Sequence, residues 1–590
     1  MDPCHKIKQI TVKQFNVYIL YVFFFISISS AQKVTINGYI IDASTNLPIP
    51  RSIILLNETG EKKSSDERGY FRFEVHTTGI YTFSVHHIAY KDAERKIVSS
   101  NLFNDTIIFS LQPKIFQSDG IIVNSTRTLS DVNNTPFPLN IVTSEQLLLQ
   151  NNTTISDALK NSAGLSMVRD GAWETAISIR GMSRSNIVML ADNSRIETAN
   201  DIAGALSLFN VHELEKIEII RSSGAALYGT GALGGILHLI SKRASFTDEF
   251  QLNSEMNSEF SSVNNCTSQY LAFEGSSEQF AGRFSGGYRK ADNTVTPAGI
   301  LPNSQFTDFN VNGSLGIRTY ESQSLRLSYQ RAQAENTGIS GGAPISTFAK
   351  ATYKLTRREF FGLDYTIPNI SQAFSFLTVR ISQQNISRNV EIVQTPTLTL
   401  TPHAIHSTTS AQLESKITAT ENNFLIIGAE VWQRRLESKR EKINKANNTI
   451  TGERPIPHST FLSAGLYGQD EWYVVPNKVT MILGARYDWI HISNDETTNP
   501  EYVISNGVLN SAPANQILLW RSGTAKNESW SGNMGIQYSL LSNLDVSFLA
   551  STAFRSPSLE ERYQYLTLGD GVHVGNPNLK PERSISMNAG

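Results

Sequence analysis

Few residue patterns in this chain have the spacing that catalysis or cofactor binding requires. A Gly-x-Gly-x-x-Gly run at residues 229–234 could cradle a dinucleotide if a helix followed it, but the segment Ile236–Ile240 has the composition of a strand. His86 and His87 are adjacent and would face opposite sides of a strand, so they do not form a zinc pair. Nucleophile elbows, zinc-binding helix motifs and Walker loops are absent from the sequence. The sequence therefore predicts neither an enzyme nor a bound cofactor.

The first 31 residues predict export. Lys6, Lys8 and Lys13 precede the apolar run at 17–28, and the small residues Ser29–Ala31 follow it. This run is shorter than the ~20 residues that a membrane-spanning helix needs. Residues 1–31 are therefore expected to be a cleaved signal peptide. No later stretch is long and apolar enough for such a helix, so any membrane span of the mature chain is expected to consist of strands.

Length and composition narrow the class of protein. At 590 residues the chain is expected to form several domains. Its formal net charge of −2 gives no basic field for nucleic acid, which is excluded as a partner. Cys4 lies in the expected signal peptide, and Cys266 alone cannot form an internal disulfide. Charged residues make up 18% of the chain, and Ser, Thr, Asn, Gly and aromatics take their place, a mixture that suits a long β-protein with polar loops and also a secreted sandwich protein.

Residues 32–112 are predicted to form a small β-sandwich. Short apolar strands alternate with turn signals, including Leu47-Pro48 and the turn Asp66–Gly69 before the alternating segment Tyr70–Val75. These residues resemble the carboxypeptidase regulatory-like domain, a non-catalytic family. Ala89-Tyr90 stands where that family has Gly-Tyr.

Residues 113–128 are expected to be a linker, and 129–243 a small mixed α/β domain. Thr143–Gln146 has capping-box spacing for a short helix, and Ser156 is predicted to cap a second helix over Asp157–Ser162. Strands are predicted at Thr175–Arg180, Asn186–Leu190 and Lys216–Ile220.

From residue 244 to 590, segments of roughly ten residues alternate between apolar and polar side chains. In Val479–Trp489 the odd positions are apolar or aromatic, whereas Arg486 and Asp488 share the other face. A soluble sandwich would bury the apolar face, and a membrane barrel would turn it to lipid. Aromatics at strand ends, such as Trp432 and Trp489, favour a barrel with aromatic girdles.

Four motifs follow one another in the α/β region. They are Ile155–Lys160, Ile177–Gly181, Ile187–Asn193 and Ile217–Arg221, the last followed by two glycine-rich turns. The ordered set resembles the plug domain of TonB-dependent receptors. Its motif positions are Arg180, Gly181, Arg221, Tyr228, Gly229, Gly234 and Gly235. The family has Asp-Gly where Asp192-Asn193 stands here, and asparagine tolerates the positive φ that this turn needs.

The C-terminal region resembles the barrel of the same receptors. Phe554–Leu559 and Gly575–Glu582 resemble two boxes of that barrel. The resemblance implies a mainly β chain with an N-terminal β-sandwich, an α/β plug and an antiparallel transmembrane barrel of the 22-stranded type. Because residues 246–590 hold only roughly 14–16 strands at typical lengths, the C-terminal strands are expected to be missing. The truncated chain is accordingly expected not to insert stably by itself.

The resemblance also implies partners. The segment Asp119, Gly120, Ile121, Ile122, Val123, Asn124 would be the TonB box, which adds as a strand to a TonB-type energy-transducing protein of the inner membrane. It could also be an ordinary first strand of the plug. The remaining implied partners are outer-membrane lipid and a small-molecule nutrient.

The imported nutrient is expected to be an iron complex, such as a ferric siderophore or haem, or cobalamin. His573 lies between the two barrel boxes, where haem-importing members have an axial ligand, so His573 and Arg555 are candidate ligand-binding residues. A solvated loop histidine is the other interpretation of His573. The alternative functions are an outer-membrane signal-transducing receptor and a passive gated porin without energy coupling.

Overall fold

The computed structural model describes residues 33–43, 47–76, 79–87, 90–98, 106–111, 122–123, 130–131, 135–149, 154–198, 204–223, 225–319, 323–341, 349–371, 373–420, 422–476, 478–541, 544–568 and 571–590. They belong to two compact units, Met1–Gly120 and Ile121–Gly590. The expected signal peptide lies outside the described residues, as does the linker at 113–128 apart from Ile122 and Val123. Within the described part of the chain, no helix has the length and apolar character needed to cross a membrane.

The N-terminal unit holds two small sheets that share one hydrophobic core. One sheet has the order β4-β1-β7 and the other β3-β2-β5-β6. Phe71, Phe73 and Phe83 lie at the centre of the core, because alternate residues of each strand point inward. The strands are β1 (Lys33–Asp42), β2 (Ile53–Leu56), β3 (Glu61–Ser64), β4 (Tyr70–His76), β5 (Ile80–His87), β6 (Tyr90–Val98) and β7 (Ile107–Leu111).

The predicted turn at Asp66–Gly69 enters β4. The Tyr70 amide donates to Asp66 Oδ1 at 2.8 Å, and the Ile40 amide donates to the Gly69 carbonyl at 2.8 Å. Gly69 has φ +72°, and a Cβ there would lie 2.4 Å from the Ile40 carbonyl oxygen. Only glycine fits this position without strain.

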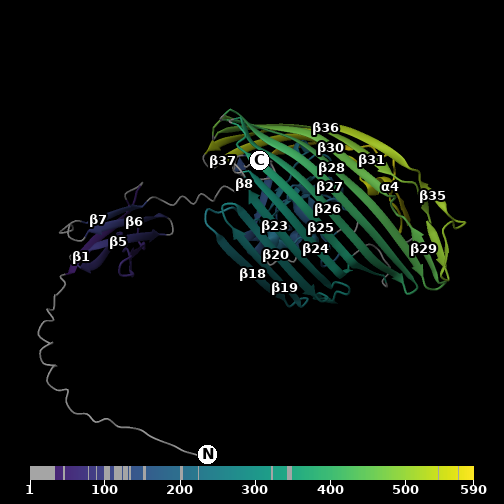
Figure 1. Cartoon of the computed structure of the whole chain (residues 1–590), viewed down its shortest axis with the longest axis horizontal. Coiled ribbons are helices and arrows are strands. Elements are labelled where there is room, and N and C mark those ends of the chain that lie inside the picture. The colour runs from purple at the N-terminus through teal and green to yellow at the C-terminus, as the bar shows by residue number, and fades with distance from the viewer. Residues whose placement is uncertain are drawn as a thin grey trace, which may run out of the picture. The chain divides into compact units, whose positions relative to one another are not determined.

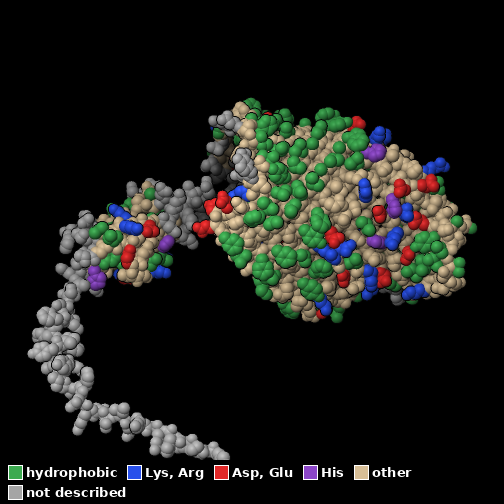
Figure 2. Space-filling model, in the orientation of Figure 1, with side chains coloured by type: hydrophobic (Ala, Val, Ile, Leu, Met, Phe, Trp, Pro, Cys, Tyr) green, Lys and Arg blue, Asp and Glu red, His purple; other side chains and the backbone are tan. Residues whose placement is uncertain are grey.

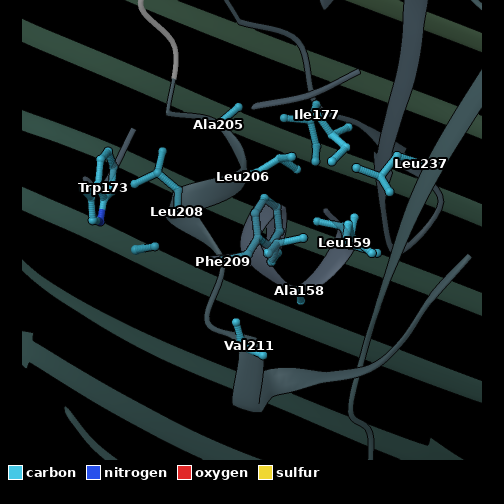
Figure 3. Packing of buried hydrophobic residues seen from close by; sticks show 14 of the residues in the cluster. Ala158, Leu159, Trp173, Ile177, Ala205, Leu206, Leu208, Phe209, Val211 and Leu237 are labelled. Atoms are coloured by element: carbon cyan, nitrogen blue, oxygen red, sulfur yellow. The ribbon is translucent and has the colours of Figure 1, made fainter. Parts of the chain in front are cut away.

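The plug region of the second unit is built on a five-stranded sheet of order β10-β16-β17-β14-β15, with a three-stranded sheet β11-β12-β13 beside it. In its core Leu206 lies beside Ile177, Phe209 beside Leu159, and Leu208 points toward Trp173 (Figure 3). The elements are β10 (Leu139–Thr143), α1 (Ser144–Leu149), α2 (Ile155–Leu159), β11 (Leu165–Arg169), β12 (Thr175–Ile179), β13 (Met182–Ser183), η3 (Arg184–Asn186), β14 (Ile187–Ala191), β15 (Ser194–Arg195), η4 (Leu206–Leu208), η5 (Val211–Glu213), β16 (Leu214–Ile220), α3 (Ala225–Tyr228) and β17 (Gly235–Ser241).

One of the two predicted helix caps is correct. Thr143 and Gln146 form the reciprocal capping-box contacts before α1. The prediction that Ser156 caps the second helix is wrong, because α2 begins at Ile155, two residues before the predicted start, and Thr154 accepts from the Asp157 amide. Threonine caps a helix by the same hydroxyl chemistry, so sequence spacing alone did not separate the two residues.

The turn between β14 and β15 forms as the sequence predicts. Asp192 and Asn193 have φ of +48° and +66°. Two successive left-handed residues make the turn type that joins a tight hairpin. Asn193 therefore replaces the usual glycine without loss of the turn.

Most of the remaining chain of this unit forms a 17-stranded antiparallel sheet that curves around the plug (Figure 1). In order along the sheet its strands are β18 (Gln251–Ser261), β19 (Cys266–Ser276), β20 (Phe280–Ala291), β23 (Phe306–Arg318), β24 (Ser324–Ile339), β25 (Lys350–Pro368), β26 (Phe374–Thr395), β27 (Leu398–Thr420), β28 (Asn423–Asn444), β29 (Thr449–Glu453), β30 (Ser459–Val475), β31 (Val479–Asn494), β33 (Tyr502–Ser505), β34 (Val508–Asn510), β36 (Gly523–Leu541), β37 (Leu544–Arg555) and β40 (Glu582–Ala589). Within the described residues, β18 and β40 are not paired with each other.

This sheet exposes its apolar face and buries its polar face, whereas a soluble sandwich does the opposite. On β31, Leu483 is 62% exposed, whereas Arg486 is 1% exposed on the face toward the plug. Leu466 on β30 and Trp530 on β36 are exposed in the same way. Figure 2 shows hydrophobic side chains spread over the visible outer surface. The sandwich interpretation of this region is therefore wrong, and the apolar outer face is that of a barrel wall.

Candidate functional site

Arg486 on β31 joins the sheet to the plug. Its Nε donates to Asp488 Oδ1 at 2.8 Å, and its Nη1 donates to Glu430 Oε2 at 3.1 Å and to the Leu227 carbonyl at 3.2 Å. A Cβ at Gly229 would lie 2.8 Å from Arg486 Nε. The motif glycine therefore leaves room for the buried guanidinium.

A second arginine holds the same plug segment from within the plug. Arg195 donates through Nη2 to the Tyr228 carbonyl and to the Thr230 carbonyl, the latter at 2.9 Å. Its guanidinium lies 4.9 Å from the ring centroid of Trp432 on β28. The predicted motif residues Tyr228 and Gly229 are thus fixed between two arginines.

The other predicted motif residues shape the plug. Arg221 donates to the Ala163 carbonyl at 2.9 Å, and Arg180 donates to Asn588 Oδ1 on β40 at 2.7 Å. Gly181 has φ +82°, and at Gly235 a Cβ would lie 2.4 Å from the Ile220 carbonyl oxygen. At Gly234 a Cβ would lie 2.6 Å from Met182 Cβ. These contacts support structural roles for the motif.

The carboxylate of the β14–β15 turn links the plug to the neighbouring strands. Asp192 accepts from the Ser241 amide at 3.0 Å and from Gln330 on β24 at 2.9 Å, and Arg243 lies 3.3 Å away. Burial opposes ionisation, but the Arg243 charge and the Ser241 hydrogen bonds hold the pKa of Asp192 below its usual value. This carboxylate is therefore charged and fully paired.

A cavity of about 120 Å³ lies between the plug and the sheet. The plug contributes segments around η3, β15 and the loop before β12, and the sheet contributes β28, β30 and the end of β37. Its charged and aromatic lining consists of Asp170, Glu174, Arg184, Arg195, Glu197, Trp432, Arg434, Phe461 and Arg555. Most of these residues were not predicted, because residues far apart in sequence meet only when the sheet closes on the plug.

Arg555, a predicted ligand-binding residue, lines the cavity but is tied to other groups. It donates to Ser185 Oγ of the plug at 3.1 Å, to Glu561 Oε2 at 2.6 Å and to Glu582 Oε2 at 3.0 Å. Glu561 belongs to α4 (Leu559–Tyr563), which begins with a capping box at Ser558. The predicted barrel box thus orders a short helix at the rim of the cavity.

Arg434 and Arg195 are also paired with carboxylates. Arg434 contacts Glu560 of α4 and lies 3.9 Å from Glu197, and its Nη2 is 2.9 Å from His406 Nδ1. Arg195 lies 3.3 Å from Glu197. The charges of Arg434 and Arg195 are therefore balanced by neighbouring carboxylates.

Glu174 differs from the other carboxylates of the lining. It is 2% exposed, and neither of its oxygens has a hydrogen-bond partner among the described residues. Tyr353 on β25 approaches it without the geometry of a hydrogen bond, since that hydroxyl is also unpaired. Burial raises the pKa of Glu174 to about 7, and Tyr353, Arg388 and Arg184 offset only part of the rise.

The remaining predicted site residues lie elsewhere. His573 is exposed on β39 (Gly571–Val574), which pairs with β38 (Tyr565–Leu568), and it does not line the cavity. The described residues contain no group of three His, Cys, Asp or Glu side chains that could hold a metal ion. In the expected TonB box, Ile122 and Val123 form β8 and pair with β9 (Ser130–Asp131). Asp119, Gly120, Ile121 and Asn124 lie outside the described residues.

A plug held by buried ion pairs inside a curved sheet with an apolar outer face defines the class of plugged outer-membrane barrels. Comparison with protein families agrees. Residues 260–590 match a model described as TonB dependent receptor-like, beta-barrel, and residues 131–236 match the TonB-dependent receptor plug domain. The chain belongs to the TonB-dependent receptor family. Residues 36–123 match the CarboxypepD_reg-like domain, so both predicted resemblances are confirmed, as is the prediction of a non-enzymatic protein.

Individual relatives are distant. A curated vitamin B12 transporter, BtuB of Photobacterium profundum, is 20% identical over 482 residues, which cover 79% of this chain and 66% of the relative. The chain thus spans about two thirds of that protein. Among solved structures, the copper transporter OprC has a TM-score of 0.63 at 15% identity, covering 76% of this chain and 69% of its own. A double mutant of the Serratia marcescens hemophore receptor HasR, in complex with HasA and heme, has a TM-score of 0.61 at 14% identity and covers 78% and 69%. Such structural matches show the fold alone.

Proposed function

We propose that this protein imports a scarce nutrient across the outer membrane, driven by a TonB-type protein of the inner membrane. The observation that carries the proposal is the plug seated within the sheet, with Arg486 and Arg195 holding Leu227–Thr230. A passive porin needs an open lumen, whereas this one is filled by a packed domain. The exposed apolar face of the sheet suits contact with outer-membrane lipid.

Energy coupling is proposed to act through Asp119–Asn124. An extended, β-branched segment can add as a strand to a partner sheet through its backbone groups. Among the described residues, Ile122 and Val123 have strand conformation and pair with Ser130 and Asp131. Exchange of this pairing for one with the partner would couple the two proteins. A pull on this segment would then be transmitted to β10, the first long strand of the plug sheet.

The nutrient is proposed to be an iron complex, such as a ferric siderophore or haem, or cobalamin. Relatives named as transporters of vitamin B12 and receptors of a heme-carrying hemophore support this range. Axial ligation of haem by His573 stays a prediction. Titrating haemin into the wild type and His573→Ala checks it, and identical absorption spectra would dismiss ligation at this residue.

Coupling is tested without knowledge of the nutrient. The purified full chain is mixed with the periplasmic domain of a TonB-type protein, and complex formation is measured by sedimentation. Ile122→Pro removes a backbone N–H from the segment and is expected to weaken the complex at least roughly tenfold. The matched control Ile122→Val keeps the β-branched side chain and the N–H, and should bind as the wild type does. Equal binding by all three proteins would contradict the assignment.

A further inference from the structure

The plug contacts the sheet through the tip of a hairpin, residues 170–174, which connects β11 to β12. The indole Nε1 of Trp173 in this tip donates to Asp308 Oδ2 on β23 at 2.7 Å. The buried Trp173 ring also lies edge-on to the ring of Tyr353 on β25, with the two centroids 6.0 Å apart. One side chain of the hairpin tip is therefore docked on two strands of the sheet.

The backbone of the hairpin tip contacts the sheet as well. The Asp170 carbonyl accepts from the amide of Gly341, which follows β24, at 2.8 Å. A Cβ at Gly171 would lie 3.2 Å from the Gly338 carbonyl oxygen on β24, so the two backbones pass close together. These contacts and the Trp173 side chain fix the tip against three neighbouring strands.

Glu174, the last residue of the tip, is its weak point. The side chain is buried, and neither carboxylate oxygen has a hydrogen-bond partner among the described residues. The groups that face it are Asp170 of the tip, Arg184 of η3, Tyr353 of β25 and Arg388 of β26. A buried carboxylate without a hydrogen-bond partner is far less costly when it is protonated than when it is charged.

We propose that the hairpin tip is a proton-controlled latch between the plug and the sheet. The tip stays docked while Glu174 carries its proton. When the tip detaches, the carboxyl group meets water and releases that proton, so each detachment frees one proton. Detachment also opens the cavity beside the plug, because Asp170, Thr175 and Ala176 form part of its lining.

The direction of the pH effect follows from the two environments of Glu174. Its pKa is about 7 in the docked tip and returns toward the ordinary 4.5 once the carboxyl group is in water. Detachment is therefore independent of pH below about 4.5, becomes more favourable as pH rises, and levels off above 7. Between pH 5 and 8 the detached fraction is expected to increase at least roughly tenfold.

Hydrogen exchange of the purified full chain in detergent tests the latch between pH 5 and 8. Mass spectrometry of short overlapping peptides gives the rates, each divided by the intrinsic rate at the same pH. The Gly341 amide is the reporter, because its acceptor on Asp170 leaves when the tip detaches. The Gly231 amide is the reference, because it donates to the Phe554 carbonyl in a separate contact between plug and sheet, at 3.1 Å. Exchange should rise at least roughly tenfold at Gly341 and by much less at Gly231.

Two variants identify the titrating group. Glu174→Gln has no proton to release, so the rise at Gly341 should disappear. Glu145→Gln alters an exposed carboxylate on α1 and should keep the rise seen in the wild type. Thermal unfolding of Glu174→Gln, with exchange at Gly231, shows whether the rest of the plug stays folded and docked.

Three outcomes would overturn the latch. They are a wild-type rate at Gly341 that does not rise with pH, an equal rise at Gly231, and an unchanged rise in Glu174→Gln. An equal rise at both amides would mean that the whole unit loosens together. The first two outcomes need only the wild type, so the test stands even if the variant does not fold. Because it needs neither a nutrient nor a TonB-type protein, the latch and the coupling tested by Ile122→Pro can fail independently.

Discussion

Two strands of the molecule have the same sequence pattern and opposite burial. β4 in the N-terminal unit alternates Phe71, Phe73 and Val75 with polar residues, and the apolar side chains are buried. β31 in the large sheet alternates in the same way, but there Leu483 is exposed and Arg486 is buried. Alternation therefore identifies a strand and its two faces, but it does not say which face meets the protein interior.

The difference lies in what the polar face can contact. On β4 the polar face meets water, which solvates Arg72 and Glu74 at no cost. On β31 it meets the plug, so each charge needs a partner, and Arg486 has both Asp488 and Glu430. The sheet therefore buries this charge by supplying both carboxylates itself, and the plug adds the Leu227 carbonyl as a further acceptor.

The largest effect should come from removing a charge on the buried polar face. Arg486→Leu leaves Asp488 and Glu430 buried without their cation and is expected to cost about 3–5 kcal/mol. Chemical unfolding followed by tryptophan fluorescence measures this, because all six tryptophans lie after Gly120. The matched change Arg72→Leu, on the exposed face of β4, should cost less than about 0.5 kcal/mol by hydrogen exchange of the N-terminal unit. Similar losses of stability in Arg486→Leu and Arg72→Leu would contradict the proposed difference between the two polar faces.

On the apolar faces, a substitution should destabilise the N-terminal unit more than the large sheet. Phe73→Ala empties part of the N-terminal core and is expected to cost about 3–5 kcal/mol in hydrogen-exchange protection of that unit. Leu483→Ala, on the exposed face of β31, should cost less than about 1 kcal/mol in detergent because little packing is lost. A large loss at Leu483 would mean that this face is buried against protein.

Some of these features could be predicted from the sequence and others could not. The alternation and the order of the motifs predicted the strands, the plug and the hairpin turn at Asp192-Asn193, because each depends on neighbouring residues. The cavity could not be predicted. Glu174 and Trp432 are brought together only by closure of the sheet around the plug, and neither residue type is unusual in its local sequence. The cap at Thr154 was missed because two hydroxyl residues compete within three positions.

The stability of the second unit should depend on pH through Glu174. The pKa of Glu174 is about 7 in the folded protein against an ordinary 4.5, so the folded state binds the extra proton. The stability that this gives is fully present below about pH 4.5 and is lost as pH rises through 7, in total about 3 kcal/mol. Asp170, Arg184, Arg388 and Tyr353 face this group and are retained in the test. Tryptophan-monitored unfolding between pH 5 and 8 should show the decline.

Glu174→Gln tests whether this decline in stability with pH comes from Glu174. The variant has no proton to lose, so the decline caused by Glu174 should be absent, whereas all other titrating groups contribute equally to both proteins. At pH 8 it should also be more stable than the wild type. An unchanged slope would assign the pH dependence to another group.

The smallest effect distinguishes two neighbouring hydroxyls inside the plug. Thr154 accepts from the Asp157 amide at 3.2 Å and donates to Asp157 Oδ2 at 2.9 Å, whereas the Ser156 hydroxyl is buried without a partner among the described residues. Thr154→Ala is therefore expected to cost about 1 kcal/mol. Ser156→Ala should be neutral or slightly stabilising, because it removes an unsatisfied polar group. Both are measured by tryptophan-monitored unfolding, and a larger loss for Ser156→Ala would restore the cap predicted from the sequence.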